Sequence, residues 1–250
     1  MTITTFLIVC PLVFAAGFVD AVAGGGGLIS LPAYMIAGLP VHYAIGTNKL
    51  SSGMGTLYTT IRYAMDGYIN WKRSIICILC AIAGSSIGSN LALLIEEKTF
   101  TIAMLFIIPV SAFFILRTHA ISDDREEYSF TKTLLISMGA AFVIGIYDGI
   151  YGPGTGTFLI LALGGLAHMK LSDANGTTKT INLTTNLTAL AVFFMHGKVR
   201  VALGLIAGAF SIAGNLLGAH FFEKGGSRIT KPLMITVLVI FFIKEIYSLI

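Results

Sequence analysis

The sequence predicts an all-α polytopic membrane protein made of two homologous repeats of about four transmembrane helices each. Of its 250 residues, 56% are hydrophobic and 11% are charged, whereas soluble domains carry about 25% charged residues. Apolar runs of the roughly 20 residues that a membrane helix needs follow one another along almost the whole chain. Glycine-rich motifs also recur in both halves at a nearly constant spacing, which is typical of internally repeated transporters.

The repeat is visible in glycines, acidic residues and lysines that keep one spacing. An offset of 128 residues carries a first group onto a second, namely Gly17, Asp20, Gly24 and Gly26 onto Gly145, Asp148, Gly152 and Gly154. An offset of 130 residues carries a further group, namely Ala44, Gly46, Thr47 and Lys49 onto Ala174, Gly176, Thr177 and Lys179. We therefore expect a first repeat over residues 1–117, a polar linker over 118–130 and a second repeat over 131–250.

In the first repeat, the opening element is expected to be a helix that breaks at four consecutive glycines, residues 24–27. A glycine inside a helix costs about 1 kcal/mol relative to alanine, so four in a row cannot continue a stable helix. The apolar run that follows, residues 28–37, is too short to cross a membrane alone, so 3–37 is predicted to be discontinuous. Full spans are then expected over 44–65, 72–95 and 99–117.

The second repeat follows the same plan, with its break at the sequence Gly-Pro-Gly-Thr-Gly of residues 152–156. Its first element is expected over 131–167, and full spans are expected over 174–195, 201–222 and 232–250. The third span of each repeat carries two glycines four residues apart, Gly84 and Gly88 in the first and Gly214 and Gly218 in the second. Small residues at this spacing let membrane helices approach closely, so we expect them to serve packing.

Basic residues after the second span of each repeat bear on the topology. Lys72 and Arg73 follow one span, and Lys198 and Arg200 follow its counterpart. Because basic loops favour the cytoplasm, this pattern favours eight crossings with both repeats in the same orientation. Basic residues within 224–231 count against that topology, and full crossing by the short glycine-flanked segments would instead give inverted repeats. The sequence leaves this choice open.

The two glycine breaks form the first part of a candidate anion site. Non-helical backbone at membrane depth is tolerated only where protein or a water-filled cavity satisfies its amides. A helix that begins after such a break directs its positive end there. The alternative is that these glycines only allow close helix contact. The candidate residues are Gly24, Gly25, Gly26, Gly27, Gly152, Gly154, Thr155 and Gly156.

Lys49 and Lys179 supply the charge of this candidate site. A lysine within an apolar span is costly and is usually functional, although each lies close enough to a span end for its ammonium group to reach the interface instead. Polar residues follow at helical spacing and face either a cavity or neighbouring helices. They are Asn48 and Ser52 in the first repeat and Thr178, Asn182 and Asn186 in the second.

Asp20 and Asp148 lie deep in the first span of each repeat, immediately before the breaks. A buried carboxylate there either pairs with a lysine or carries a proton, so both residues are proton-coupling candidates. Three cysteines, Cys10, Cys77 and Cys80, lie in apolar runs and are expected to pack. Cys77 and Cys80 have CxxC spacing, but the second pair and the histidines of a zinc site are missing. No catalytic spacing occurs either, so we expect no enzyme activity, no metal and no cofactor.

The expected partners follow from the composition. The chain has a net charge of +4. In a membrane protein, an excess of basic residues is typical of the cytoplasmic loops. The sequence has no basic cluster with interleaved aromatic residues, so nucleic-acid binding is not predicted. We therefore expect a small anionic substrate and the lipid bilayer as partners, and no nucleic acid. A homodimer stays an open option. His42, His168 and His196 lie near span ends, where solvated side chains are expected.

The segment 17–27, followed by Pro32 and by Ala-Ile-Gly-Thr-Asn-Lys at 44–49, resembles the TauE/SafE family of membrane permeases. Segments 148–156 and 174–179 resemble the second repeat of the same family, so the resemblance covers essentially the whole chain. It implies permeation or export of small sulfur-containing anions, such as sulfite or organosulfonates. It also implies an integral membrane protein of the bacterial plasma (inner) membrane.

From the repeats and the candidate residues we expect transport by alternating access at a site between the two repeats, with proton coupling as an option. Two alternatives stay open, a passive anion channel and a non-transporting structural or assembly membrane protein whose glycines only pack helices. Two intramembrane lysines disfavour a cation permease because they repel cations, while Asp20 and Asp148 keep this alternative open. Thr178 replaces the equivalent of Asn48 in the second repeat, which argues against strict equivalence of the two halves of the site.

Overall fold

The computed structural model describes residues 2–117 and 126–222, and within these stretches the chain forms helices and no strands. The predicted span over 232–250 and most of the predicted linker lie outside the described residues. The elements are α1 (Ile3–Ala23), α2 (Gly27–Ile36), α3 (Val41–Met65), α4 (Trp71–Leu94), α5 (Glu97–Arg117), α6 (Phe130–Ile150), α7 (Thr155–Ile160), the π-helical turn η1 (Leu161–Leu166), α8 (Leu171–Met195) and α9 (Val201–Phe222). The prediction of an all-helical chain is confirmed over this part.

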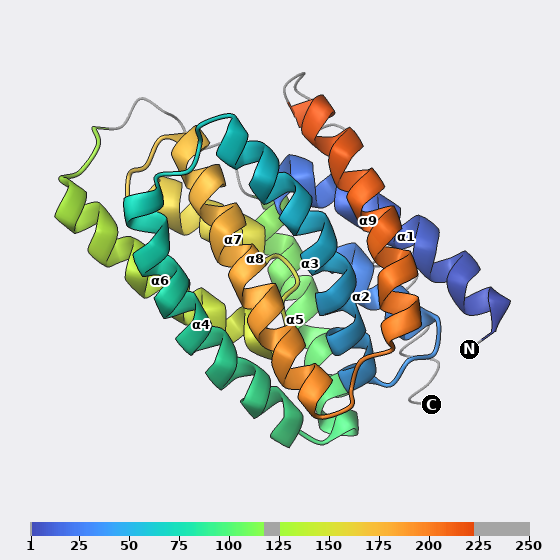
Figure 1. The fold of residues 1–250 in the computed structure, drawn as a ribbon. Coiled ribbons are helices and arrows are strands. Elements are labelled where there is room, and N and C mark those ends of the chain that lie inside the picture. The colour runs from blue at the N-terminus through green and yellow to red at the C-terminus, as the bar shows by residue number, and fades with distance from the viewer. Residues whose placement is uncertain (1, 118–125, 223–250) are drawn as a thin grey trace.

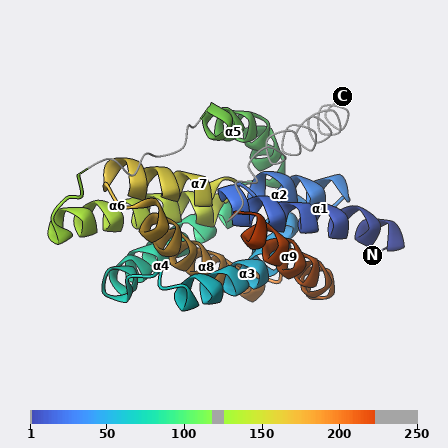
Figure 2. The ribbon, with the colours of Figure 1, turned by 90° about the horizontal axis from the view of Figure 1, so that it is seen from above.

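Within the described residues, four helices are long and apolar enough to cross a membrane: Ile3–Val22, Trp71–Leu94, Phe130–Ile150 and Val201–His220. The long helices α3 and α8 have 25 residues each and carry series of buried hydroxyl and amide side chains instead. Figure 2 shows α4, α8, α3 and α9 side by side in one layer, with α6, α7, α2 and α1 in a second layer against it. The four apolar helices thus lie at the two ends of both layers, on either side of the polar helices α3 and α8, as expected of an integral membrane protein.

Both predicted helix breaks are present. Gly24 caps α1 in the left-handed conformation, at φ 71°, and α2 begins three residues later. In the other half, α6 ends at Ile150, and Gly154, at φ 85°, precedes the start of α7. A side chain disfavours a left-handed backbone. Glycine at these two positions therefore lets the chain turn out of one helix and into the next.

Helices from opposite halves of the chain pack against each other. Gly84 and Gly88 of α4 lie against the backbone carbonyl groups of Phe142 and Ile146 in α6, so closely that a Cβ atom would overlap with them. Likewise, Gly214 and Gly218 of α9 lie against the carbonyl groups of Phe14 and Phe18 in α1. The predicted packing role of these glycines is confirmed, because only a residue without a side chain permits this approach.

Helices α3 and α8 run in opposite directions (Figure 1). Gly46, near the start of α3, lies against the carbonyl group of Lys198, just after the end of α8, and Gly176, near the start of α8, lies against that of Tyr68, just after α3. The two basic loops therefore lie at opposite ends of this helix pair, and the expectation that both face the cytoplasm is wrong. Lys198 and Arg200 lie over the ring of Tyr43, so their charges have a local partner and do not report orientation alone.

Two apolar clusters hold the layers together. The larger one joins α1, α2, α3 and α9 through residues such as Val13, Leu28 and Ile45. The smaller one joins α4, α6 and α8 and contains Cys77, with Cys80 packed at its edge. The expectation that these two cysteines pack is thereby confirmed, and both carry free thiols.

Candidate functional site

The two helix breaks meet between the layers. A Cβ atom on Gly24 would lie 2.7 Å from the carbonyl carbon of Gly156, so the two backbones are in direct contact. Beside this contact lies a cavity of about 40 Å³. On the same volume scale, one water molecule needs about 10–15 Å³. The cavity has room for a few water molecules or one small anion. Residues from α1, α2, α3, α6, α7, α8 and α9 line it.

Most of the predicted site residues line this cavity: Asp20, Gly24, Gly26, Gly27, Asn48, Lys49, Ser52, Asp148, Gly152, Gly154, Thr155, Gly156, Asn182 and Asn186. Gly25, Thr178 and Lys179 do not. The hydroxyl group of Thr178 is buried away from the cavity, and no other described residue hydrogen-bonds to it. The reason is helical drift, because each four-residue step rotates a side chain by about 40°, which turns Thr178 away when Asn186 faces inwards.

Lys49 of α3 forms an ion pair with Asp148 of α6. Its Nζ atom lies 2.8 Å from Oδ2 of Asp148, and both side chains are 2% exposed. The hydroxyl group of Thr155 donates a hydrogen bond of 2.6 Å to the other carboxylate oxygen. Gly152 leaves the space for this pair, since a Cβ atom there would lie 3.0 Å from both Lys49 Nζ and Asp148 Oδ1. Both oxygens of Asp148 are thus satisfied within the protein.

Lys179 of α8 forms the reciprocal pair with Asp20 of α1. Its Nζ atom lies 2.9 Å from Oδ2 of Asp20 and also donates to the backbone carbonyl group of Asp20 at 2.9 Å. Asp20 is more open than Asp148, with its side chain 14% exposed and lining the cavity. No described residue donates a hydrogen bond to its Oδ1 atom. The two ion pairs therefore differ in their access to the cavity.

The burial of both lysines excludes the interpretation that their ammonium groups reach the membrane interface. Each side chain is 2% exposed, and each pairs with an aspartate from the other half of the chain. The pairing explains how charged groups persist among apolar helices, because the two charges cancel locally. The four groups sum to zero charge, so any ligand that uses a lysine must compete with the paired carboxylate.

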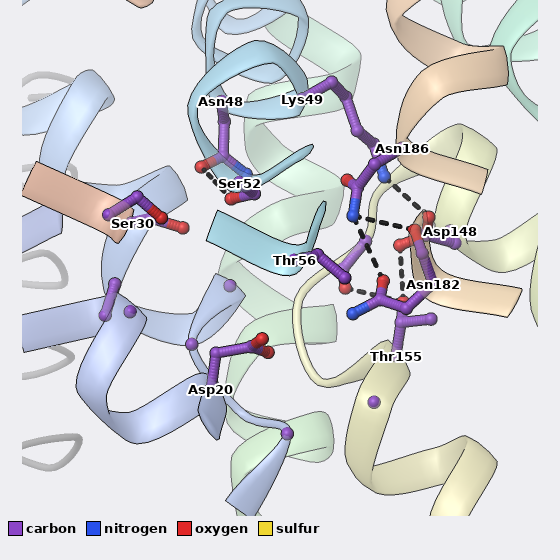
Figure 3. Close-up of a pocket in the computed structure, with 18 of the residues that line it drawn as sticks. Asp20, Ser30, Asn48, Lys49, Ser52, Thr56, Asp148, Thr155, Asn182 and Asn186 are labelled. Atoms are coloured by element: carbon purple, nitrogen blue, oxygen red, sulfur yellow. Dashed lines mark hydrogen bonds and ion pairs between the residues drawn. The ribbon is translucent and has the colours of Figure 1, made fainter. Parts of the chain in front are cut away.

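Neutral amide groups on α3 and α8 complete one side of the cavity (Figure 3). The Oδ1 atom of Asn48 accepts a hydrogen bond of 3.2 Å from Ser52, and the Nδ2 atom of Asn186 donates to the Oδ1 atom of Asn182 at 3.2 Å. These bonds use the oxygen atoms of Asn48 and Asn182. Among the described residues, none accepts a hydrogen bond from the Nδ2 groups of these two asparagines, which leaves both as donors for a ligand.

Four further polar residues line the cavity that the sequence reasoning missed: Ser30, Thr56, Ser211 and Asn215. Thr56 continues the spacing of Asn48 and Ser52 by one more helical turn, so the same rule finds it. Ser211 and Asn215 lie four residues apart in an otherwise apolar span, which is the signal that marks intramembrane polar residues for attention. Their cavity contact depends on the packing of α9 against α1, which the sequence does not show.

His42 does not have the solvated side chain expected of it. It is buried, with its Nε2 atom 3.0 Å from the carbonyl oxygen of Ala92 and its Nδ1 atom 3.4 Å from Glu97. Its ring also meets that of Phe100 edge to face, at 5.7 Å between centroids. The histidine therefore ties the start of α3 to the region between α4 and α5, away from the cavity lining.

Residues 9–244 match the protein family described as "Sulfite exporter TauE/SafE". A probable membrane transporter protein, ORF9, of Sinorhizobium sp. is 34% identical over 225 residues, covering 90% of this chain and 85% of that protein. A probable membrane transporter protein of Haemophilus influenzae is 31% identical, over 94% of this chain and 92% of that protein. The probable membrane transporter protein YfcA of Escherichia coli K12 is 28% identical, over 93% and 86% respectively. No solved structure matches the chain.

Proposed function

This chain belongs to the TauE/SafE family of membrane transporters, and on that premise we propose that it moves small sulfur-containing anions, such as sulfite or organosulfonates, across the bacterial inner membrane. The proposed substrate site is the cavity between the two helix breaks. The proposed process is translocation, with no chemical change of the substrate, through a cavity lined by amide, hydroxyl, backbone and charged groups.

The observation that carries the proposal is the pair of buried lysines beside this cavity. Lys49 itself lines the cavity, and Lys179 reaches it through Asp20. A buried ammonium group is costly unless it has an anionic partner, so an entering anion can replace a carboxylate as that partner. The start of α2 at Gly27 adds the positive end of a helix dipole to the same cavity wall.

The same exchange supports proton coupling at Asp20. When an anion takes over the ammonium group of Lys179, the carboxylate of Asp20 loses its partner in a desolvated setting and is expected to bind a proton. Asp148 is less suited to this role because its two oxygens are held by Lys49 and Thr155 and its side chain is 2% exposed. We therefore favour Asp20 over Asp148 as the proton carrier.

Alternating access between two inverted repeats is the proposed mechanism. Its support is a set of contacts that occur twice, once in each sense between the two halves. Helix α1 packs on α9 as α6 packs on α4, and Gly46 and Gly176 each contact the carbonyl group of a loop. The two ion pairs likewise each join a lysine of one half to an aspartate of the other. Related halves that pack in opposite orientation around one site are the arrangement from which many transporters alternate.

Flux through the purified protein in proteoliposomes tests the proposal. We expect uptake of labelled sulfite or sulfoacetate above that of empty vesicles, with a rate that depends on an imposed pH gradient. No flux of any sulfur anion would leave the structural or assembly alternative. Rates far above carrier turnover that ignore the pH gradient would indicate a passive channel. Leu79→Ala, on an exposed face of α4, serves as the matched control for reconstitution.

A further inference from the structure

The hydroxyl group of Thr155 makes the two ion pairs unequal. It lies 2.6 Å from Oδ1 of Asp148, whereas no described residue donates a hydrogen bond to Oδ1 of Asp20. We propose that Thr155 is a positioning residue that keeps Asp148 ionised and thereby assigns proton binding to Asp20. The inference rests on the proposed function with its proton coupling, and it names the residue that decides which carboxylate takes the proton.

Thr155 and Gly27 occupy the same place in the two repeats. The offset of 128 residues that carries Asp20 onto Asp148 also carries Gly27 onto Thr155. Each is the first residue of the helix that follows a break, Gly27 in α2 and Thr155 in α7. Because glycine has no hydroxyl group, the first repeat lacks the donor that the second repeat places against its aspartate.

Pro153 explains why position 27 carries no side chain. A Cβ atom on Gly27 would lie 2.8 Å from the Cα atom of Pro153, which is too close for two carbon atoms that are not bonded to each other. By the same offset, the counterpart of Pro153 is Gly25, which has no side chain to occupy the corresponding place. The two differences between the breaks therefore belong together, since the proline of one break excludes a hydroxyl-bearing side chain from the other.

The hydroxyl group of Thr155 is held beside Asp148 (Figure 3). It lies 2.6 Å from the carboxylate and 2.6 Å from the carbonyl oxygen of Gly152, so its single proton is shared between two acceptors. The side chain is buried, and its backbone amide group also bonds to the carbonyl group of Gly152, at 3.1 Å. A hydrogen bond to the charged form of a carboxylate favours that form, so Thr155 stabilises ionised Asp148.

The charged surroundings of the two carboxylates are otherwise alike. Asp148 faces Lys49 of α3, and Asp20 faces Lys179 of α8. The remaining side chains that line the cavity are neutral. At the level of Asp148, α4 places only serine and glycine against α6. The titratable residue of α9, which packs on α1, is His220, and it is exposed. Thr155 is thus the main difference in the stabilisation of the two charges.

This difference decides what happens when an anion enters. An anion that takes over Lys179 leaves Asp20 with no donor to its carboxylate, whereas one that takes over Lys49 leaves Asp148 with the donor of Thr155. Without that hydroxyl group, Asp148 would depend on its lysine alone, as Asp20 does. A hydrogen bond to a charged group changes such an equilibrium by about tenfold or more. Asp148 lines the cavity, so a proton from cavity water can reach it.

Rescue of proton coupling tests the inference. Uptake of labelled sulfoacetate by proteoliposomes is measured with and without an imposed pH gradient. Asp20→Asn is expected to lose its response to the gradient, and Asp20→Asn with Thr155→Val is expected to regain it through Asp148. Asp20→Asn with Thr155→Ser keeps a hydroxyl group and should stay unresponsive. A double variant with Thr155→Val that remains unresponsive would overturn the inference.

Thr180→Val, also combined with Asp20→Asn, is the matched control. Thr180 is a buried threonine of α8 whose hydroxyl group donates to the backbone carbonyl group of Thr177, and it lies outside the cavity lining. Its loss removes one buried hydroxyl group without touching either carboxylate. Recovery of the gradient response in this control to the same extent as with Thr155→Val would contradict a specific role of Thr155.

Infrared difference spectroscopy keeps the inference testable if Asp20→Asn fails to fold. Sulfoacetate is added at neutral pH, where its own acidic groups are ionised, so a new band of a protonated carboxyl group comes from the protein. Wild type and Thr155→Ser are expected to show one such band. Thr155→Val with Asp20 intact is expected to show a second band, from Asp148. Absence of the second band would reject the role of Thr155.

The two proposals fail in different ways. Wild-type protein without sulfoacetate or sulfite flux would reject transport, and wild-type flux that ignores the pH gradient would reject proton coupling. Wild-type flux that follows the gradient, together with no rescue by Thr155→Val, would reject only the assignment of Thr155. In that case the burial of Asp148, at 2% exposed against 14% for Asp20, is what keeps it from binding a proton.

Discussion

The ammonium group of Lys49 lies 2.8 Å from the carboxylate of Asp148, and both side chains are 2% exposed. These residues come from opposite halves of the chain, and the reciprocal pair of Lys179 and Asp20 differs in having its carboxylate 14% exposed to the cavity. The carboxylate of Asp148 is therefore less open to a ligand than that of Asp20. We thus expect the loss of Asp148 to affect mainly stability and the loss of Asp20 to affect mainly coupling.

Asp148→Asn is expected to destabilise the protein strongly. It leaves Lys49 buried without its anionic partner, and breaking a buried ion pair from one side costs about 3–5 kcal/mol. Thermal unfolding in detergent measures the effect. Asp66→Asn, which removes the half-exposed pair with Arg62, is the control, since surface pairs contribute about 0–1 kcal/mol. An equal loss of stability in the two variants would contradict the stabilising role of the buried Lys49–Asp148 pair.

Asp20→Asn is expected to change coupling. The open carboxylate is the proposed proton carrier, so its neutral amide should abolish the dependence of transport on a pH gradient while anion exchange persists. Counterflow of labelled anion, measured with and without the gradient, separates these outcomes. Retained dependence on the gradient in Asp20→Asn would reject this residue as the carrier.

Lys179→Met is expected to weaken substrate binding by about tenfold or more, because a hydrogen bond from a charged group contributes about 1.5–3 kcal/mol. Lys49→Met should weaken it as well. Titration of folded protein in nanodiscs gives the dissociation constants directly. Wild-type affinity in both variants would show that the lysines serve only the ion pairs. Lys72→Met, at an exposed position on α4, is the control for loss of charge.

Gly156→Ala is expected to abolish transport. A Cβ atom at this position would lie 2.7 Å from the carbonyl oxygen of Gly24, so the two helix breaks must separate to admit it. Gly139→Ala in α6 is the matched control, because no atom lies within 4 Å of the added Cβ. That variant should be as active as wild type and gain up to about 1 kcal/mol of helix stability. Normal flux in Gly156→Ala would show that contact between the breaks is not needed.

Several parts of the site follow from local rules and were predictable. Four glycines at 24–27 end a helix wherever they occur, because the cost is a property of the backbone. The polar residues Asn48, Ser52, Asn182 and Asn186 share faces through the helical period alone, and all four line the cavity. Thr178 was misplaced by the same rule, because a stripe drawn at four-residue steps drifts around the helix.

The sequence by itself thus determined the helical membrane class, the two breaks and most of the residues that line the cavity. Only the tertiary structure decided that Lys49 pairs with Asp148 and not with Asp20, that α3 and α8 run in opposite directions, and that Asn215 faces the cavity. The physical reason is the sequence distance over which each effect acts. Composition, helical period and glycine act over a few residues, whereas an ion pair between residues far apart in the chain depends on how whole helices pack.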